Sequence, residues 1–230
     1  MKRTVAYLGV ILVCASSAYA QGEAASDGVY VRVGGGATFV SNQEQDYTFN
    51  PDVVFAGGPP SGQMVDNGEG YFLSGALGFD YADGIRTELE YRYASTSIAG
   101  VTVNHPTFGP SPMTPINDDI KAHFILSNFY FDWTNDSRLT PFIGGGVGGA
   151  FVENENGDRD AALAYQGRAG VAFDMGGGFS LDTEYVYLRT NKLSYGPEDE
   201  DFAPGGPAGP RIDGDRYEAS NVMVSVRKQF

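Results

Sequence analysis

Polar and apolar side chains alternate along residues 217–230 of this chain. One face of the expected strand carries Val222, Val224, Val226 and Phe230, and the other carries Tyr217, Asn221, Ser225, Arg227 and Gln229. A strand of a lipid-embedded barrel turns its apolar face outward to the lipid and its polar face inward. A soluble sandwich instead buries its apolar face and exposes the polar one. The pattern therefore predicts a strand in the wall of a membrane barrel.

Alternating segments of this kind recur along the chain. We predict strands at 28–40, 69–82, 85–97, 120–134, 140–152, 161–175, 179–191 and 216–230. The gaps after the second, fourth and sixth strands are short, and the first of them, Asp83-Gly84, is a hairpin-turn signal. The remaining gaps, 41–68, 98–119, 153–160 and 192–215, are mostly longer. Short turns at one end and long loops at the other predict an all-β fold, an eight-stranded antiparallel up-and-down transmembrane β-barrel.

The strand at 85–97 shows the clearest division between two faces. Ile85, Leu89, Tyr91 and Tyr93 lie on one face, and Arg86, Glu88, Glu90 and Arg92 lie on the other. A solvated sheet edge could look the same, but several other strands repeat the arrangement. The interior of an eight-stranded barrel is just wide enough for side chains to fill it, and buried charges need partners. We therefore predict an interior charge network of Arg32, Arg86, Glu88, Glu90, Arg92, Arg168, Asp174, Asp182, Glu184 and Arg227, with Asp80 and Asp132 as further acidic members.

The division between faces is ambiguous for the strand at 120–134. We assign Ile125, Phe129, Phe131 and Trp133 to the outside, and Asn128, Tyr130 and Asp132 to the inside. Aromatic residues on the outward faces then fall into two groups when the strands are threaded up and down. One end of the wall collects Phe79, Tyr81, Phe131, Trp133, Phe179 and Phe230, and the other collects Phe39, Tyr91, Tyr93, Phe151, Tyr185 and Tyr187. Two such girdles are expected at the two membrane interfaces.

The N-terminus has the pattern of a secretory signal. Lys2 and Arg3 precede an apolar run at 5–13, which is much shorter than the roughly 20 residues of a membrane helix. An A-x-A site ends at Ala20, before Gln21. We predict a signal peptide at 1–20, cleavage between Ala20 and Gln21, and one outer-membrane β-barrel domain at 21–230.

Composition narrows the possible functions. Loss of the signal removes the only cysteine, Cys14, and with it any disulfide. It also changes the formal net charge from -14 to -16, because the two basic residues leave with it. So acidic a chain is a poor candidate for binding nucleic acid.

Candidate catalytic groups are few. The histidines are His105, in a long gap, and His123, four residues before Ser127. Residues four apart on a strand share a face but lie too far apart to hydrogen-bond directly, so no nucleophile with its base is indicated. The glycine runs at 34–36 and 144–146 lack the Lys-Ser/Thr pair and the helix of a phosphate loop, and they suit a tightly coiled barrel wall.

Acidic residues gather in the long gaps. They are Glu44, Asp46, Asp52, Asp66, Asp118, Asp119, Glu153, Glu155, Asp158, Asp160, Glu198, Asp199, Glu200, Asp201, Asp213 and Asp215. Hard divalent cations prefer such oxygen ligands, whereas the simpler interpretation is a solvated acidic surface. No EF-hand spacing occurs, and the sequence assigns neither a metal site nor a cofactor.

Several segments resemble the small eight-stranded outer-membrane barrels, the family of the OmpA transmembrane domain, OmpX and the opacity-protein-like surface antigens. The resemblance lies in 127–132, 141–148, 165–170, 182–185 and the terminal Phe230. It implies a monomer in the outer membrane of a Gram-negative bacterium. It also implies partners among outer-membrane lipid, lipopolysaccharide, periplasmic chaperones and the assembly machinery, which would recognise Phe230.

Fold alone does not define activity. The leading hypothesis is a structural or surface-interaction protein, serving envelope integrity, adhesion or antigenicity through four acidic loops that host or surface ligands could bind. A narrow porin-like channel is the alternative, and a lipid A-modifying enzyme is a third class.

Overall fold

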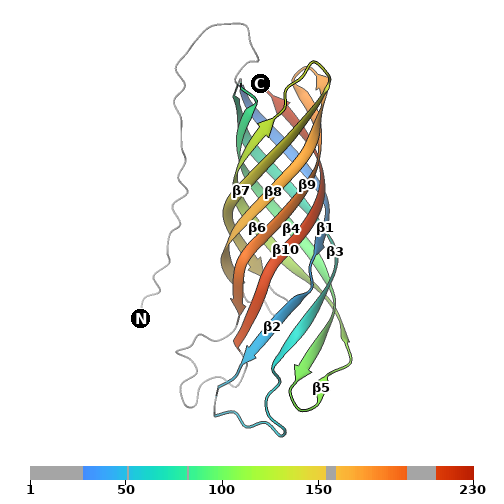
Figure 1. The fold of residues 1–230 in the computed structure, drawn as a ribbon, viewed down its shortest axis with the longest axis vertical. Helices are drawn as coiled ribbons and strands as arrows, with labels where there is room; N and C mark the ends of the chain where they lie inside the picture. The colour runs from blue at the N-terminus through green and yellow to red at the C-terminus, as the bar shows by residue number, and fades with distance from the viewer. Residues whose placement is uncertain (1–27, 51, 82, 154–158, 196–210) are drawn as a thin grey trace, which may run out of the picture.

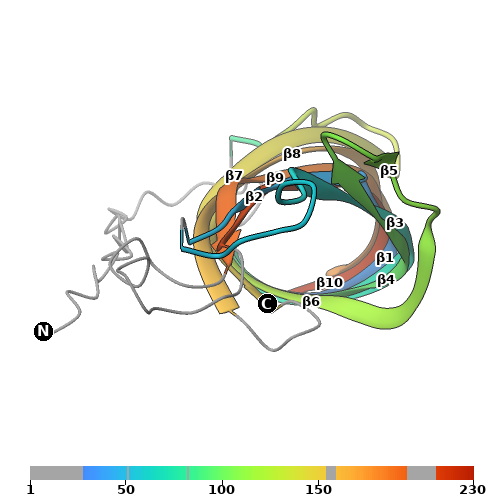
Figure 2. The same ribbon diagram turned by 90° about the horizontal axis from the view of Figure 1, so that it is seen from below.

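The computed structural model describes residues 28–50, 52–81, 83–153, 159–195 and 211–230. Eight long strands form a closed antiparallel ring (Figures 1 and 2). They are β1 (Gly28–Val40), β3 (Gly62–Tyr81), β4 (Ile85–His105), β6 (Thr114–Asp132), β7 (Leu139–Glu153), β8 (Arg159–Gly176), β9 (Phe179–Tyr195) and β10 (Arg211–Gln229). Each pairs with the next along the chain, and β1 closes the ring on β10. The predicted eight-stranded barrel is confirmed.

Two short strands, β2 (Gln43–Thr48) and β5 (Gly109–Pro110), complete the sheet. β2 pairs with β10 and β3, the same two neighbours that β1 has, so it continues the place of β1 after a break at 41–42. The gap predicted at 98–119 is therefore largely strand, and strands also occupy 43–48 and 62–68 of the gap predicted at 41–68, which corrects the sequence-based boundaries. We call β2, β5 and the adjoining ends of β3, β4, β6 and β10 the extension; it forms the lower end of the molecule in Figure 1.

Tight turns connect the strands at the opposite end of the barrel, where the C-terminus also lies (Figure 1). Gly84, in the turn between β3 and β4, has a φ of 75°, and Gly177, between β8 and β9, has a φ of 63°. Glycine takes such positive φ values at little cost. None of the residues that the structure describes forms a helix long and apolar enough to span a membrane.

The inward face of β4 and of β10 changes from polar to apolar part-way along the strand. On β4 the inward positions are Arg86, Glu88, Glu90 and Arg92, followed by Ala94, Ile98 and Val101, all of them buried. Along β10 the polar inward residues Asn221 and Ser225 follow the apolar inward residues Tyr217 and Ala219. Lipid requires an apolar outer face, and water requires an apolar inner one. We therefore infer that the outer face of the barrel contacts lipid on the short-turn side of Tyr93 and Ser220, and contacts water on the other side.

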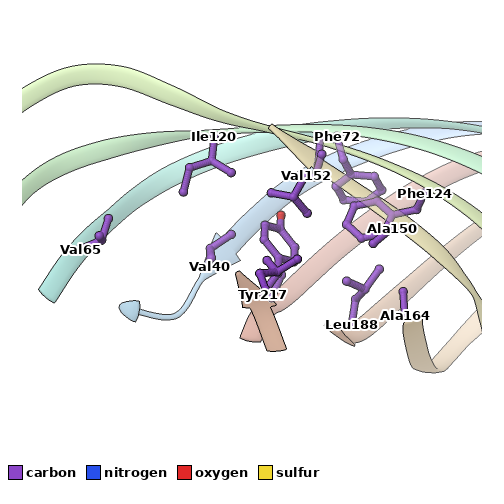
Figure 3. Close-up of a cluster of buried hydrophobic side chains, with 14 of the residues drawn as sticks. Val40, Val65, Phe72, Ile120, Phe124, Ala150, Val152, Ala164, Leu188 and Tyr217 are labelled. Carbon is purple, nitrogen blue, oxygen red and sulfur yellow. The ribbon is translucent and has the colours of Figure 1, made fainter. Parts of the chain in front are cut away.

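Buried apolar side chains fill the barrel near the extension (Figure 3). We call this cluster the upper core, although the extension beside it is at the lower end of the view in Figure 1. It consists of Val40, Val65, Phe72, Ala94, Ile98, Val101, Ile120, Ala122, Phe124, Leu126, Ala150, Val152, Ala164, Leu188, Leu193, Tyr217, Ala219 and Met223. Alternation predicts a polar interior throughout, and the structure limits that interior to the half near the short turns. Phe124 and Leu126 point inward while Ile125 points outward, which explains why the strand at 120–134 is ambiguous.

Candidate functional site

Six charged side chains meet inside the lipid-facing half of the barrel. We call them the central network: Arg32, Glu88, Glu90, Arg92, Arg168 and Glu184. Arg168 binds both oxygens of Glu184, with Nε–Oε2 and Nη2–Oε1 distances of 2.9 and 2.7 Å, and its Nη1 lies 2.6 Å from Glu90 Oε2. Arg32 joins Glu88 to Glu184. Three guanidinium groups thus balance three carboxylates, as buried charges require.

Neutral donors add further hydrogen bonds to carboxylate oxygens that the arginines also bind. The Asn128 amide donates to Glu88 at 2.9 Å and to Glu90 at 2.8 Å, and the Tyr130 hydroxyl donates to Glu88 at 2.6 Å. Asn128 lies beside Glu88 because β6 pairs with β4 in that register. On its other side stands Gly146, where an added Cβ would lie 1.8 Å from the Asn128 Oδ1. The second glycine run therefore makes room for the network.

Two further ion pairs lie nearer the short turns. Arg86 binds Asp132 through two hydrogen bonds of 2.6 and 2.8 Å, and its guanidinium carbon lies 4.6 Å from the centre of the Tyr130 ring. The Nε atom of Arg227 lies 3.3 Å from Asp182 Oδ2, and its Nη1 atom lies 3.4 Å from Asp80 Oδ2.

Asp174 does not join these pairs. It is exposed at the barrel end, where its carboxylate accepts a hydrogen bond from the Gly176 N–H at 2.8 Å. Asp174 does occupy an inward position of the alternation, but β8 ends two residues later, so water solvates the carboxylate. The prediction that Asp174 belongs to the interior network is therefore corrected.

Water reaches the charged interior from the short-turn end of the described barrel. A hollow of about 500 Å³ opens there, with Asp80, Asp132, Asp174 and Arg227 among its lining residues. Further in, the side chains of Glu90 and Arg168 are 0% exposed. The upper core follows beyond them. Along the barrel, a buried layer of charged side chains is therefore followed by a layer of apolar ones.

His105 joins two loops of the extension. Its Nε2 lies 2.9 Å from the Gly58 carbonyl oxygen, and its Nδ1 accepts the backbone N–H groups of Thr107 at 3.1 Å and Phe108 at 3.3 Å. Since Nδ1 accepts, we assign the proton to Nε2, which donates to Gly58. The Thr107 hydroxyl donates to the Gly57 carbonyl at 2.9 Å. The connection between β2 and β3 is thereby fastened to the one between β4 and β5.

Large apolar side chains are exposed around this fastening. Val54 is 92% exposed, Phe108 72% and Met113 51%, and we call these three the tip residues. The centres of the Phe108 and His105 rings lie 4.5 Å apart, and this contact orients the Phe108 side chain. Asp52 is exposed on the loop between β2 and β3, and Asp118 and Asp119 are exposed on the end of β6 that belongs to the extension. Within the part of the chain that the structure describes, no three His, Cys, Asp or Glu side chains come together as a metal site; the acidic run at 198–201 lies outside it.

Two sequence predictions concern the ends of the chain. Ala20 and Gln21, at the expected cleavage site, lie outside the described residues. Phe230 follows β10, is 75% exposed, and donates its backbone N–H to the Val29 carbonyl at 3.0 Å. Its recognition by assembly factors stays a prediction.

Comparison with known proteins gives consistent matches. A model of the outer membrane protein β-barrel domain matches residues 6–230. The chain is 24% identical to the outer membrane protein PagN of Salmonella typhimurium over 212 residues, which cover 84% of this chain and 86% of PagN. It is 27% identical to an uncharacterized protein of Brucella suis over 191 residues, 67% of this chain and 66% of that relative, just under two thirds of its length. The crystal structure of the outer membrane protein OprG from Pseudomonas aeruginosa superposes with a TM-score of 0.60 at 16% identity, covering 88% of this chain and 96% of OprG.

Proposed function

Because the chain belongs to the outer membrane protein β-barrel domain family, we propose that it acts at the cell surface through its extension and does not conduct through its lumen. It is an integral β-barrel protein of the Gram-negative outer membrane. The main support for a non-conducting role is the closed interior, in which fully buried Glu90 and Arg168 are followed by the upper core.

The extension supports a surface role in adhesion, antigenicity or envelope integrity. Short turns of such barrels face the periplasm and long loops face the exterior, so the extension and its acidic loops face outward. The His105 contacts hold Phe108 and fasten its loop to the loop that carries Val54, and pre-organised loops lose less entropy on binding. Exposed apolar groups bordered by charged ones are typical of protein-interaction sites.

Catalysis is not part of the proposal. His123 lies on the outer wall, where its Nδ1 is 2.8 Å from the Tyr91 hydroxyl, and His105 is engaged by loop backbone. Neither histidine is placed to activate a serine nucleophile. We also propose that the signal at 1–20 is removed after Ala20, that periplasmic chaperones and the assembly machinery deliver the chain, and that it works as a monomer.

A cell-attachment assay tests the surface role. A non-adherent laboratory strain would express either the wild-type protein or a variant in which Val54, Phe108 and Met113 are all changed to serine. We expect attachment of the wild-type cells to epithelial monolayers and its loss in the variant. The control is Met175→Ser, which alters an apolar residue, 46% exposed, at the short-turn end.

Heat-dependent gel migration would show that each variant is folded. Attachment that is equal in the tip variant and the wild type, or a wild type that adds no attachment to the strain, would refute a surface role of the tip residues.

A further inference from the structure

The lipid-facing wall is hollowed at one place. An apolar hollow of about 440 Å³ lies on the outside of the barrel across β1, β3, β4 and β6. Its outward side chains are Val31, Val33, Leu77, Leu89, Tyr91 and Ile125, and Gly75 lies among them. Sites for small ligands usually enclose about 300–1,000 Å³, so the hollow is large enough to hold part of a ligand.

Gly75 creates the hollow without being required by the packing of the protein. It pairs with Val33 on one side and Tyr91 on the other, and both of those side chains are exposed on the outer wall. A Cβ added at Gly75 would meet only the Arg32 carbonyl oxygen, at 4.0 Å. By contrast, a Cβ at Gly35, on the neighbouring β1, would lie 2.8 Å from the Phe72 carbonyl oxygen. Glycine at 75 therefore leaves space on the lipid side rather than relieving a contact inside.

Two polar features border the hollow: the exposed Ser127 beside Leu89, and a hydrogen-bonded pair at the end nearer to the extension. The Tyr91 hydroxyl is hydrogen-bonded to His123 Nδ1 at 2.8 Å, and the Tyr93 ring lies 5.2 Å from the His123 ring. Tyr93 on β4 pairs with His123 on β6. This pair lies two residues nearer to the extension than the pair of Tyr91 and Ile125. Tyrosine favours the level of lipid headgroups. A molecule in the hollow would therefore have its hydrocarbon toward the short turns and its polar part toward the cell exterior.

We propose that this hollow is a binding site for an acyl chain of lipopolysaccharide, with Tyr91 and His123 contacting the polar linkage of that chain. Hydrocarbon is the only medium at this depth, and a chain lying in a concave surface gains dispersion contacts on three sides that a flat wall does not offer. The polar end faces the extension, so the lipid belongs to the outer leaflet, whose characteristic lipid is lipopolysaccharide. The site is independent of the surface role proposed above.

Native mass spectrometry of protein extracted from outer membranes in mild detergent tests the site. The wild type should retain one lipopolysaccharide molecule. Gly75→Leu fills the hollow and should lower that retained fraction by about tenfold, the change that a difference of about 1.4 kcal/mol in affinity produces. Gly167→Leu is the matched control, because Gly167 is an exposed β8 glycine outside the hollow, where an added Cβ meets nothing within 4 Å.

A second variant guards against an effect peculiar to position 75. Val33→Phe fills the same hollow from β1, where Val33 is 64% exposed, and should lower retention as Gly75→Leu does. Folding of every variant is checked by heat-dependent migration. Equal retention in Gly75→Leu and Gly167→Leu would overturn the proposal, as would a wild type that carries no lipid or only glycerophospholipid.

Discussion

Replacing Arg168 with methionine should unfold the barrel more readily than any substitution of a surface arginine. Arg168 has no exposed side-chain surface and forms hydrogen bonds to Glu90 and Glu184. Methionine keeps much of the volume and removes the charge. The central network would then hold three carboxylates against two guanidinium groups, and breaking such a buried pair costs about 3–5 kcal/mol.

The double variant Arg168→Met/Glu184→Met separates charge imbalance from lost packing. It leaves Arg32 and Arg92 opposite Glu88 and Glu90, which restores the balance of charge. We expect it to be less destabilised than the sum of the two single variants, with a coupling free energy of about 0.5–3 kcal/mol. The matched control is Arg189→Met, because Arg189 pairs with Glu218 at 3.4 Å where both side chains are about one third exposed. Exposed pairs contribute about 0–1 kcal/mol.

Urea titration in lipid vesicles, followed by heat-dependent gel migration, would give the free energies of unfolding. Two results would refute the reasoning. One is that Arg168→Met is tolerated as well as Arg189→Met, and the other is that the double variant is as unstable as the sum of its singles. Either would mean that the Arg168 charge is not compensated by the central network.

Three further predictions follow from neighbouring parts of the structure. Phe124→Ala should cost about 3–5 kcal/mol because its side chain is buried in the upper core, whereas Ile125→Ala on the lipid face should cost clearly less; the same titration compares them. His105→Ala should release the loops and raise hydrogen exchange at 55–61, because it removes hydrogen bonds worth about 0.5–1.5 kcal/mol each; unchanged exchange would contradict the fastening. Protease applied to intact cells should cut at 49–61 and spare the turn at Gly84, and the opposite pattern would reverse the topology.

Much of the barrel could be predicted from the sequence because lipid imposes a strict alternation. Arg86, Glu88, Glu90 and Arg92 occur at every second position, and each is buried in the structure. Glycine residues mark the short turns in the sequence. The predicted strand boundaries therefore agree most closely with the structure at the strand ends near those turns. The specific pairing, such as Arg168 between Glu90 and Glu184, depends on the register of several strands and could not be read from one of them.

The extension could not be predicted for a physical reason. Past Tyr93 the wall faces water, so the apolar face turns inward, and a strand that crosses this boundary has no single pattern along its length. Phe124 and Ile125 show a related difficulty just on the lipid side of this boundary, because adjacent residues are apolar on opposite faces. Asp174 shows another limit, since alternation gives the face of a residue but not whether the strand continues far enough to bury it.

Single-channel recording in planar bilayers would show whether the lumen is closed. Purified wild-type protein should show little steady conductance, or only rare small openings, because Glu90 and Arg168 are fully buried beneath the upper core. Stable, large single-channel currents from the wild type would contradict the account and would establish a pore.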